Sequence, residues 1–203
     1  MKICRYAMLR FGKKAYVSIF ALLAAAAVIF ADTSSGTLAV LSAIITHEAG
    51  HLLALRLVGA SVKRVLIYPF GVDISSDIER VGYAKEILVN LSGAAANLTA
   101  AAVCMLYTAV SGEPALVFFM LCNVFFFITN LIPIRSLDGG KALENLLCMR
   151  FPLDKALQTS AAVSYFSYFI LGAFSLIILY VSECNISLTA YIMLSAFLAE
   201  KLI

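Results

Sequence analysis

The two histidines of the chain, His47 and His51, lie in the pentapeptide His47-Glu48-Ala49-Gly50-His51, inside an apolar stretch. Residues four apart share one face of a helix, so both imidazoles can bind the same metal ion. Glu48 lies beside them, where its carboxylate can take a proton from water activated by that ion. This spacing predicts a zinc site with a general base, which suits hydrolysis. A chance match is the alternative, but an ionisable Glu48 within a membrane is costly and usually marks function.

Catalytic zinc takes three protein ligands and a water, so the predicted site needs one more ligand. With no other histidine in the chain, that ligand must be Asp, Glu or Cys. Asp138 stands out because Pro133 precedes it and Gly139 and Gly140 follow it. The proline is expected to interrupt a helix and the glycine pair to permit an unusual backbone turn, an arrangement that can line a polar cavity at membrane depth. An ordinary surface Asp-Gly turn is the alternative, and the incomplete zinc site favours a ligand.

The elements that must hold these residues are membrane helices. Of the 203 residues, 63% are hydrophobic and 13% are charged, with a mean hydropathy of +0.97. Soluble domains have roughly a quarter of their residues charged, so this composition predicts an integral membrane protein. We expect an all-α polytopic fold and a single membrane domain over residues 1–203, with no separate soluble domain. Segments near the roughly 20 residues that a helical span needs lie at 15–31, 38–60, 84–110, 114–134, 161–181 and 186–203.

The charge distribution predicts the orientation of these six helices. All 15 Lys and Arg residues lie in the amino-terminal tail or near alternate helix ends. The other connections, around Asp32, Glu113 and Glu183, carry acids and no base. Because basic loops stay on the cytoplasmic side, both termini are predicted to be cytoplasmic. The net charge of +3 follows from this topology, and no nucleic-acid partner is expected.

A hydrophilic segment at residues 61–83 breaks the helical pattern. Within it, residues 62–74 are rich in β-branched and aromatic side chains, with a Pro69-Phe70-Gly71 turn near the middle. This pattern predicts one or two short strands or a hairpin at the cytoplasmic membrane surface. An amphipathic loop joining two helices is the alternative. Residues 135–155 are expected to form a second long cytoplasmic connection.

The zinc motif is followed, late in the next-but-one helix, by Asn130 and the tripeptide Leu137-Asp138-Gly139. This combination resembles the site-2 protease family of intramembrane zinc metalloproteases, in its compact bacterial, sporulation-type branch. The resemblance covers about residues 38–146, a three-helix catalytic core. It implies that Asp138 is the third zinc ligand and that Asn130 orients the substrate or stabilises the oxyanion.

One family motif, Gly-Pro-x-x-Asn in the intervening helix, is only partly present. Residues 93–97 stand in its place: Gly93 and Asn97 match, and Ala94 replaces the proline, so no kink is implied there. From the residues alone, this stretch is better explained by close helix packing with one amide bonding across than by support of the site. Asn123 is likewise interpreted as a packing or lipid-facing residue.

The resemblance implies zinc-dependent hydrolysis of a peptide bond in or near the transmembrane segment of a membrane-anchored or single-span protein. One Zn²⁺ per chain would be held by His47, His51 and Asp138, with Glu48 as general base and then acid. Residues 62–74 would hold the substrate extended by strand addition. The implied setting is a bacterial cell membrane, with the lipid bilayer and a separate regulatory membrane protein as partners.

Two other interpretations stay open. A different membrane zinc peptidase would use Glu144 rather than Asp138 as its third ligand. A non-catalytic membrane protein would bind metal or a partner helix without cutting. The intact Glu48 argues against this second interpretation, because binding alone needs no general base.

Overall fold

The computed structural model describes residues 8–11, 15–18, 35–68, 71–112 and 115–181. The chain divides into two compact units, Met1–Ile128 and Thr129–Ile203. The predicted span at residues 186–203, and residues 19–31 of the first predicted span, lie outside the described residues.

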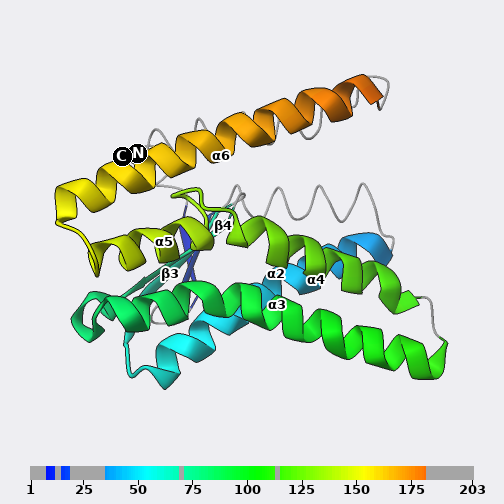
Figure 1. Cartoon of the computed structure of the whole chain (residues 1–203). Helices are drawn as coiled ribbons and strands as arrows, with labels where there is room; N and C mark the ends of the chain where they lie inside the picture. The colour runs from blue at the N-terminus through cyan, green and yellow to red at the C-terminus, as the bar shows by residue number, and fades with distance from the viewer. Residues whose placement is uncertain (1–7, 12–14, 19–34, 69–70, 113–114, 182–203) are drawn as a thin grey trace. The chain divides into compact units, whose positions relative to one another are not determined.

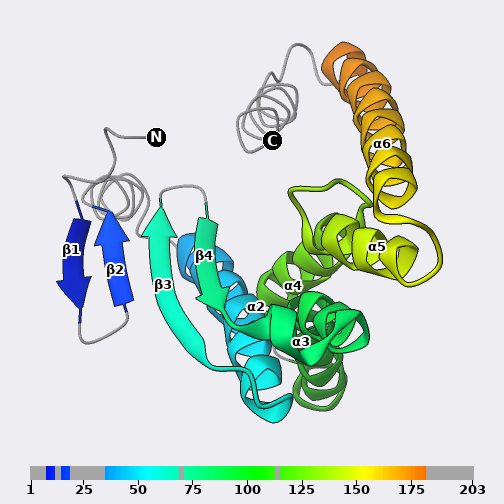
Figure 2. The same cartoon turned by 90° about the vertical axis from the view of Figure 1, so that its left-hand side faces the viewer.

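The first unit contains a four-stranded sheet in the order β1-β2-β3-β4 (Figure 2). Its strands are β1 (Met8–Phe11), β2 (Ala15–Ser18), β3 (Val62–Tyr68) and β4 (Gly71–Ser76). β2 pairs antiparallel with β1 and parallel with β3, and β3 pairs antiparallel with β4 from Tyr68↔Gly71 back to Val62↔Ser76. The β3–β4 pair confirms the predicted hairpin, and it rules out a loop without strands.

The start of the first predicted helix is wrong, because residues 15–18 form strand β2. Hydropathy alone cannot distinguish a helix from a strand in a short apolar run. Tyr16 and Val17 favour strands, and here they find a partner strand, pairing with Leu66 and Ile67 of β3. The tertiary partner therefore decides the local structure.

The helices of the first unit are α2 (Ser35–Leu57), the short 3₁₀ helix η2 (Ile78–Val81), α3 (Tyr83–Ser111) and α4 (Ala115–Leu131), whose last turn belongs to the second unit (Figure 1). α2 and α3 confirm the predicted helices at 38–60 and 84–110 to within a few residues. α4 ends at Leu131, two residues before Pro133. This confirms the predicted interruption, since proline and the residue before it cannot easily continue a helix.

α2 and α3 cross at very short range because both carry small residues at the crossing. A Cβ atom at Gly50 would lie 2.6 Å from the backbone oxygen of Ser92 and 2.7 Å from Cβ of Ala96. The predicted close helix packing is confirmed. An apolar cluster beyond the crossing joins the end of α2, the sheet and α3, and its buried members are Leu55, Ala60 and Val89.

The second unit contains α5 (Asp138–Cys148) and α6 (Leu153–Val181), which pack against each other. One predicted bound is corrected here, because α6 begins well before residue 161. The predicted connection at residues 135–155 contains the short helix α5. Asp154 and Lys155 lower the local hydropathy and hide the start of α6 from a search for apolar spans. Pro152, directly before the first helical residue, is a helix-start signal of another kind.

A polar cluster ties the connection before α5 to both helices of this unit. The guanidinium Nε of Arg135 donates to Glu144 Oε2 at 2.8 Å, and Ser160 Oγ donates to the same oxygen at 3.1 Å. The backbone N–H of Arg135 donates to Ser164 Oγ at 3.0 Å. These bonds fix the short segment that leads from α4 into α5.

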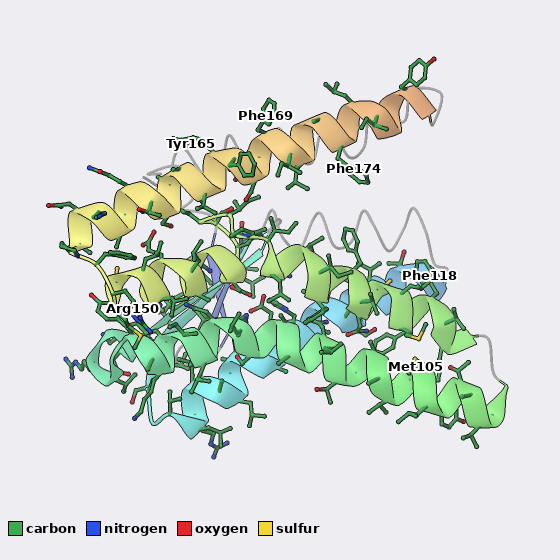
Figure 3. All side chains as sticks on the ribbon, viewed as in Figure 1. Met105, Phe118, Arg150, Tyr165, Phe169 and Phe174 are labelled. Atoms are coloured by element: carbon green, nitrogen blue, oxygen red, sulfur yellow. The ribbon has the colours of Figure 1, made fainter. Side chains whose placement is uncertain are left out.

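Three described helices are long and apolar enough to cross a membrane, namely Gly36–Leu57, Tyr83–Ser111 and Leu153–Ile177, while Leu116–Leu131 is apolar but shorter. Large apolar side chains project from them, among them Met105, Phe118, Tyr165, Phe169 and Phe174 (Figure 3), all of which are at least half exposed. Such exposure is unusual in water and suits lipid. The prediction of an integral membrane protein is confirmed at this level, with three of six predicted spans found at full length among the described residues.

The α2–α3 crossing yields a test of the fold. We expect Gly50→Ala to lower the free energy of unfolding by about 1–3 kcal/mol, because its Cβ overlaps backbone and side-chain atoms of α3. Thermal unfolding in detergent measures this change. Gly172→Ala in α6 is the matched control, since nothing lies within 4 Å of a Cβ there and the variant should be as stable as the wild type or more so. Equal stability of both variants would contradict the close crossing.

Candidate metal centre

His47 and His51 occupy successive turns of α2 and turn their Nε2 atoms towards each other, 3.1 Å apart. The rings are nearly perpendicular, with their centroids 4.8 Å apart. His47 is buried and His51 is half-buried. The predicted convergence of the two imidazoles is confirmed.

The other nitrogen of each ring is held by an oxygen atom. Nδ1 of His47 lies 2.8 Å from Oδ1 of Asn97, and Nδ1 of His51 lies 2.8 Å from the backbone oxygen of Val89. A carbonyl oxygen only accepts, so each Nδ1 carries a proton and donates it. In a neutral imidazole the lone pair then lies on Nε2. Both rings therefore present acceptor atoms to the same point.

Zinc fits this arrangement. Zn–N bonds of about 2.0–2.1 Å at tetrahedral angles separate two ligand nitrogens by about 3.3 Å, close to the 3.1 Å found here. Gly93 on α3 keeps the space beside the nitrogens open. A Cβ at that position would lie 2.8 Å from His47 Nε2 and closer still to His51 Nε2. The absence of a side chain at Gly93 is therefore required for this arrangement of the two rings.

Glu48 follows His47 directly in α2 and is half-buried. A carboxylate within a span is costly unless it has a task, which agrees with the predicted role of a base. Asn130 is the last but one residue of α4 and is also half-buried. It thus lies just before the helix ends, as the sequence predicted.

Asp138 is the first residue of α5 and only 8% exposed, which rules out the alternative of a surface turn. The positive end of the helix dipole favours its carboxylate there, and Lys141 Nζ lies 3.4 Å from its Oδ1. Gly139 and Gly140 are helical, so the predicted unusual turn is wrong. Their actual role is close approach, since Cβ atoms on them would overlap the backbone of residues 131–135.

The two carboxylates considered as third ligand have different surroundings. Asp138 begins α5 and, like the two histidines, offers a ligand atom of a type that zinc binds. Glu144, in contrast, accepts hydrogen bonds from Arg135 and Ser160 in the second unit. Its contacts are those of a structural carboxylate.

Sequence reasoning favoured helix packing for Asn97 over support of the site, and the structure shows both. The small residues around it do pack closely, as predicted, but its amide also bonds the first histidine. Asn123 is fully buried and therefore does not face lipid. Its Oδ1 accepts a hydrogen bond from Asn97 Nδ2 at 2.8 Å. The available signal was the cost of burying an amide in a span, which applies to both residues.

Comparison with known proteins shows what the chain is similar to. The model of Peptidase family M50 matches residues 108–174. Stage IV sporulation protein FB of Bacillus subtilis is 27% identical over 171 residues, which cover 82% of this chain and 59% of that protein. Zinc metalloprotease MJ0392 of Methanocaldococcus jannaschii is 23% identical over 154 residues, covering 73% of this chain and 44% of that protein. The chain thus spans about half the length of these relatives.

The fold has a solved counterpart. The site-2 protease from Methanocaldococcus jannaschii superposes with a TM-score of 0.68 at 20% sequence identity, covering 96% of this chain and 94% of that one. Together these matches confirm the resemblance to the site-2 protease family that the motifs predicted.

The open space at Gly93 gives a direct test of the metal centre. We expect Gly93→Ala to weaken zinc binding at least about tenfold, because its Cβ would displace both imidazole rings from their alignment. Competition with a chelator of known affinity measures this loss, and Gly172→Ala is the control for a helical glycine replaced at an open position. Zinc binding as tight as in the wild type would show that the nitrogens do not meet beside Gly93.

Proposed function

Proceeding from the similarity of this chain to Peptidase family M50, we propose that it is an intramembrane zinc metalloprotease. It hydrolyses a peptide bond in or near the transmembrane segment of a membrane-anchored or single-span protein. The observation that carries this proposal is the pair of histidine Nε2 atoms 3.1 Å apart on a helix long enough to cross a membrane. Glu48 follows His47 directly in the same helix. An ionisable residue next to a metal-binding histidine within a membrane helix is costly, and few functions other than hydrolysis require one.

His47, His51 and Asp138 are the proposed ligands of one Zn²⁺ per chain. Two neutral imidazoles and one carboxylate match the ligand types of catalytic zinc sites and leave a fourth position open. Bound zinc supplies Lewis acidity, which makes water a stronger acid and a peptide carbonyl a better electrophile. A relative named as a zinc metalloprotease supports the choice of metal.

Glu48 is the proposed general base. Its carboxylate takes a proton as water attacks the peptide carbonyl carbon, and returns a proton to the amine nitrogen when the C–N bond breaks. Asn130 has the proposed role of orienting the substrate strand or donating its amide N–H to the developing oxyanion. Its place at the end of α4, just before the interruption by Pro133, supports this role because the backbone there leaves the helix.

A substrate helix must unwind before hydrolysis, because its carbonyls are engaged in intrahelical bonds. We propose that the sheet holds the unwound segment extended. β4 is an edge strand of the described sheet, and a row of backbone N–H and C=O groups on an edge can pair with an added strand. Backbone pairing of this kind is tolerant of substrate sequence.

The proposed setting is a bacterial cell membrane with both termini in the cytoplasm. The whole chain, residues 1–203, acts there as one integral membrane protease domain. The distribution of Lys and Arg supports the orientation. A separate membrane protein is the proposed regulator.

Replacing the base tests the chemistry apart from metal binding. We expect Glu48→Gln to lower the rate of cleavage of single-span substrates at least about 100-fold while zinc stays bound, because the amide cannot accept the proton. Cleavage and zinc content are measured on the same detergent-purified samples. Glu86→Gln, in the first turn of α3, is the matched control and should cleave normally. Full activity of Glu48→Gln would contradict the proposed role of Glu48 as general base.

The third ligand can be identified by comparing two carboxylate variants. Asp138→Ala should lose zinc, with an affinity loss beyond the roughly 10–100-fold typical of residues that only orient a ligand. Glu144→Ala should keep zinc and lose about 1 kcal/mol of stability, because its partners are Arg135 and Ser160. The readouts are zinc per chain by mass spectrometry and thermal unfolding. The reverse pattern would assign the ligand to Glu144.

A further inference from the structure

We propose that Asn97 and Asn123 are positioning residues for the metal centre. They form a buried chain of amides that sets which nitrogen of His47 carries the proton and therefore which nitrogen faces the metal. This inference rests on the proposed metal site. It concerns how that site is held in order, and it assigns a role to two residues that touch neither metal nor substrate.

The chain of amides runs across three helices of the first unit. Asn97 on α3 places its Oδ1 2.8 Å from His47 Nδ1, and its Nδ2 donates to the backbone oxygen of Ala43 on α2 at 2.9 Å. The same Nδ2 donates to Oδ1 of Asn123 on α4 at 2.8 Å. Asn123 in turn donates through Nδ2 to the backbone oxygen of Phe119 at 2.9 Å. Both amides are completely buried.

Two backbone carbonyls give this chain a fixed direction. The oxygens of Ala43 and Phe119 can only accept, so each amide must present its nitrogen to them. Turning the Asn97 amide over would press its oxygen against the Ala43 oxygen and against Oδ1 of Asn123. Oδ1 of Asn97 therefore faces His47, and the proton of that imidazole must lie on Nδ1. Nε2 is left with the lone pair that a metal needs.

Because both amides are buried, neither can easily turn over. In an apolar interior an amide that loses its partners finds no water to replace them, so the flipped state is strongly disfavoured. With only acceptors at its far end, the chain has no second arrangement of equal energy. It holds one tautomer and also one ring orientation, because the Nδ1–Oδ1 bond fixes the rotation of the imidazole.

The two histidines differ in the group that accepts from Nδ1, which gives the proposal an internal control. Nδ1 of His51 donates to the backbone oxygen of Val89, which no side-chain substitution removes. Ser92 Oγ lies farther away, 3.4 Å from His51 Nδ1, and donates its own proton to the same Val89 oxygen. The shortest bond of Nδ1 is therefore to a side chain at His47 and to the backbone at His51. A purely structural role of Asn97, as an amide that joins three helices, would affect both histidines alike through the shared α2–α3 crossing.

The tautomers can be read in the metal-free protein. The full chain contains only two histidines, so ¹⁵N-histidine NMR in detergent shows two imidazoles. We expect Nδ1–H at both residues in the wild type. In Asn97→Ala, His47 should become a mixture of tautomers while His51 remains unchanged. A wild-type tautomer at His47 in this variant would overturn the proposal, as would equal changes at both histidines.

Metal affinity gives an independent readout. Chelator competition with Zn²⁺ should show a loss of about 10–100-fold in Asn97→Ala, the range for residues that orient a metal ligand. The Co²⁺-substituted variant should show altered d–d absorption bands. Asn123→Ala should lose less, since Asn97 keeps its bond to Ala43. Thr99→Val, an exposed α3 position whose hydroxyl bonds only its own helix, should bind as the wild type does.

A conservative variant separates positioning from packing. Asn97→Asp keeps an acceptor for His47 but loses the donor to Ala43 and Asn123. We expect Asn97→Asp to bind zinc more tightly than Asn97→Ala does, although it is less stable than the wild type. A packing role would instead lower zinc affinity and stability together. Wild-type zinc affinity in Asn97→Ala overturns this inference alone. Absence of zinc binding in the wild type, after metal replenishment, overturns the proposed function as well.

Discussion

Two nitrogen lone pairs, one from His47 and one from His51, are held 3.1 Å apart within a pair of apolar helices. The arrangement is repulsive by itself, and a cation between the nitrogens turns that repulsion into attraction. Much of the first unit serves to maintain it: the absence of side chains at Gly50 and Gly93 lets α3 approach, and α3 supplies the oxygen atoms that hold both rings. Metal binding and the packing of α2 against α3 are therefore thermodynamically coupled.

The membrane explains why polar groups gather at this one place. Most hydroxyl groups on the described spans, such as those of Thr46, Thr99 and Ser167, bond to a carbonyl of their own helix and need no neighbour. The amides of Asn97 and Asn123 instead bond between helices. In hydrocarbon such bonds can be made only among the helices themselves, so they specify which faces meet. The site and the helix arrangement are thus determined together.

The convergence of the two histidines could be predicted from the sequence, whereas the residues that hold their rings could not. Spacing alone brought His47 and His51 together, and the proline after Asn130 marked the end of α4 correctly. The partner of a buried amide depends on helix rotation, however, so Asn97 looked like a packing residue. The same limit hid β2, because its strand conformation depends on a partner strand far along the chain. It also hid the role of Gly139, which lies in a helix and allows close approach to the backbone of Leu131.

The parallel pairing of β2 with β3 has a consequence for biosynthesis. Ala15 pairs with Val65, so β3 leaves the ribosome on the order of 50 residues after its neighbour. At translation rates of roughly 5–20 residues per second, β2 waits several seconds with one edge unpaired. The whole of α2, with both histidines, is made during this interval. Closure of the sheet is therefore a late event, which follows synthesis of the metal-binding helix and joins the segments on either side of it.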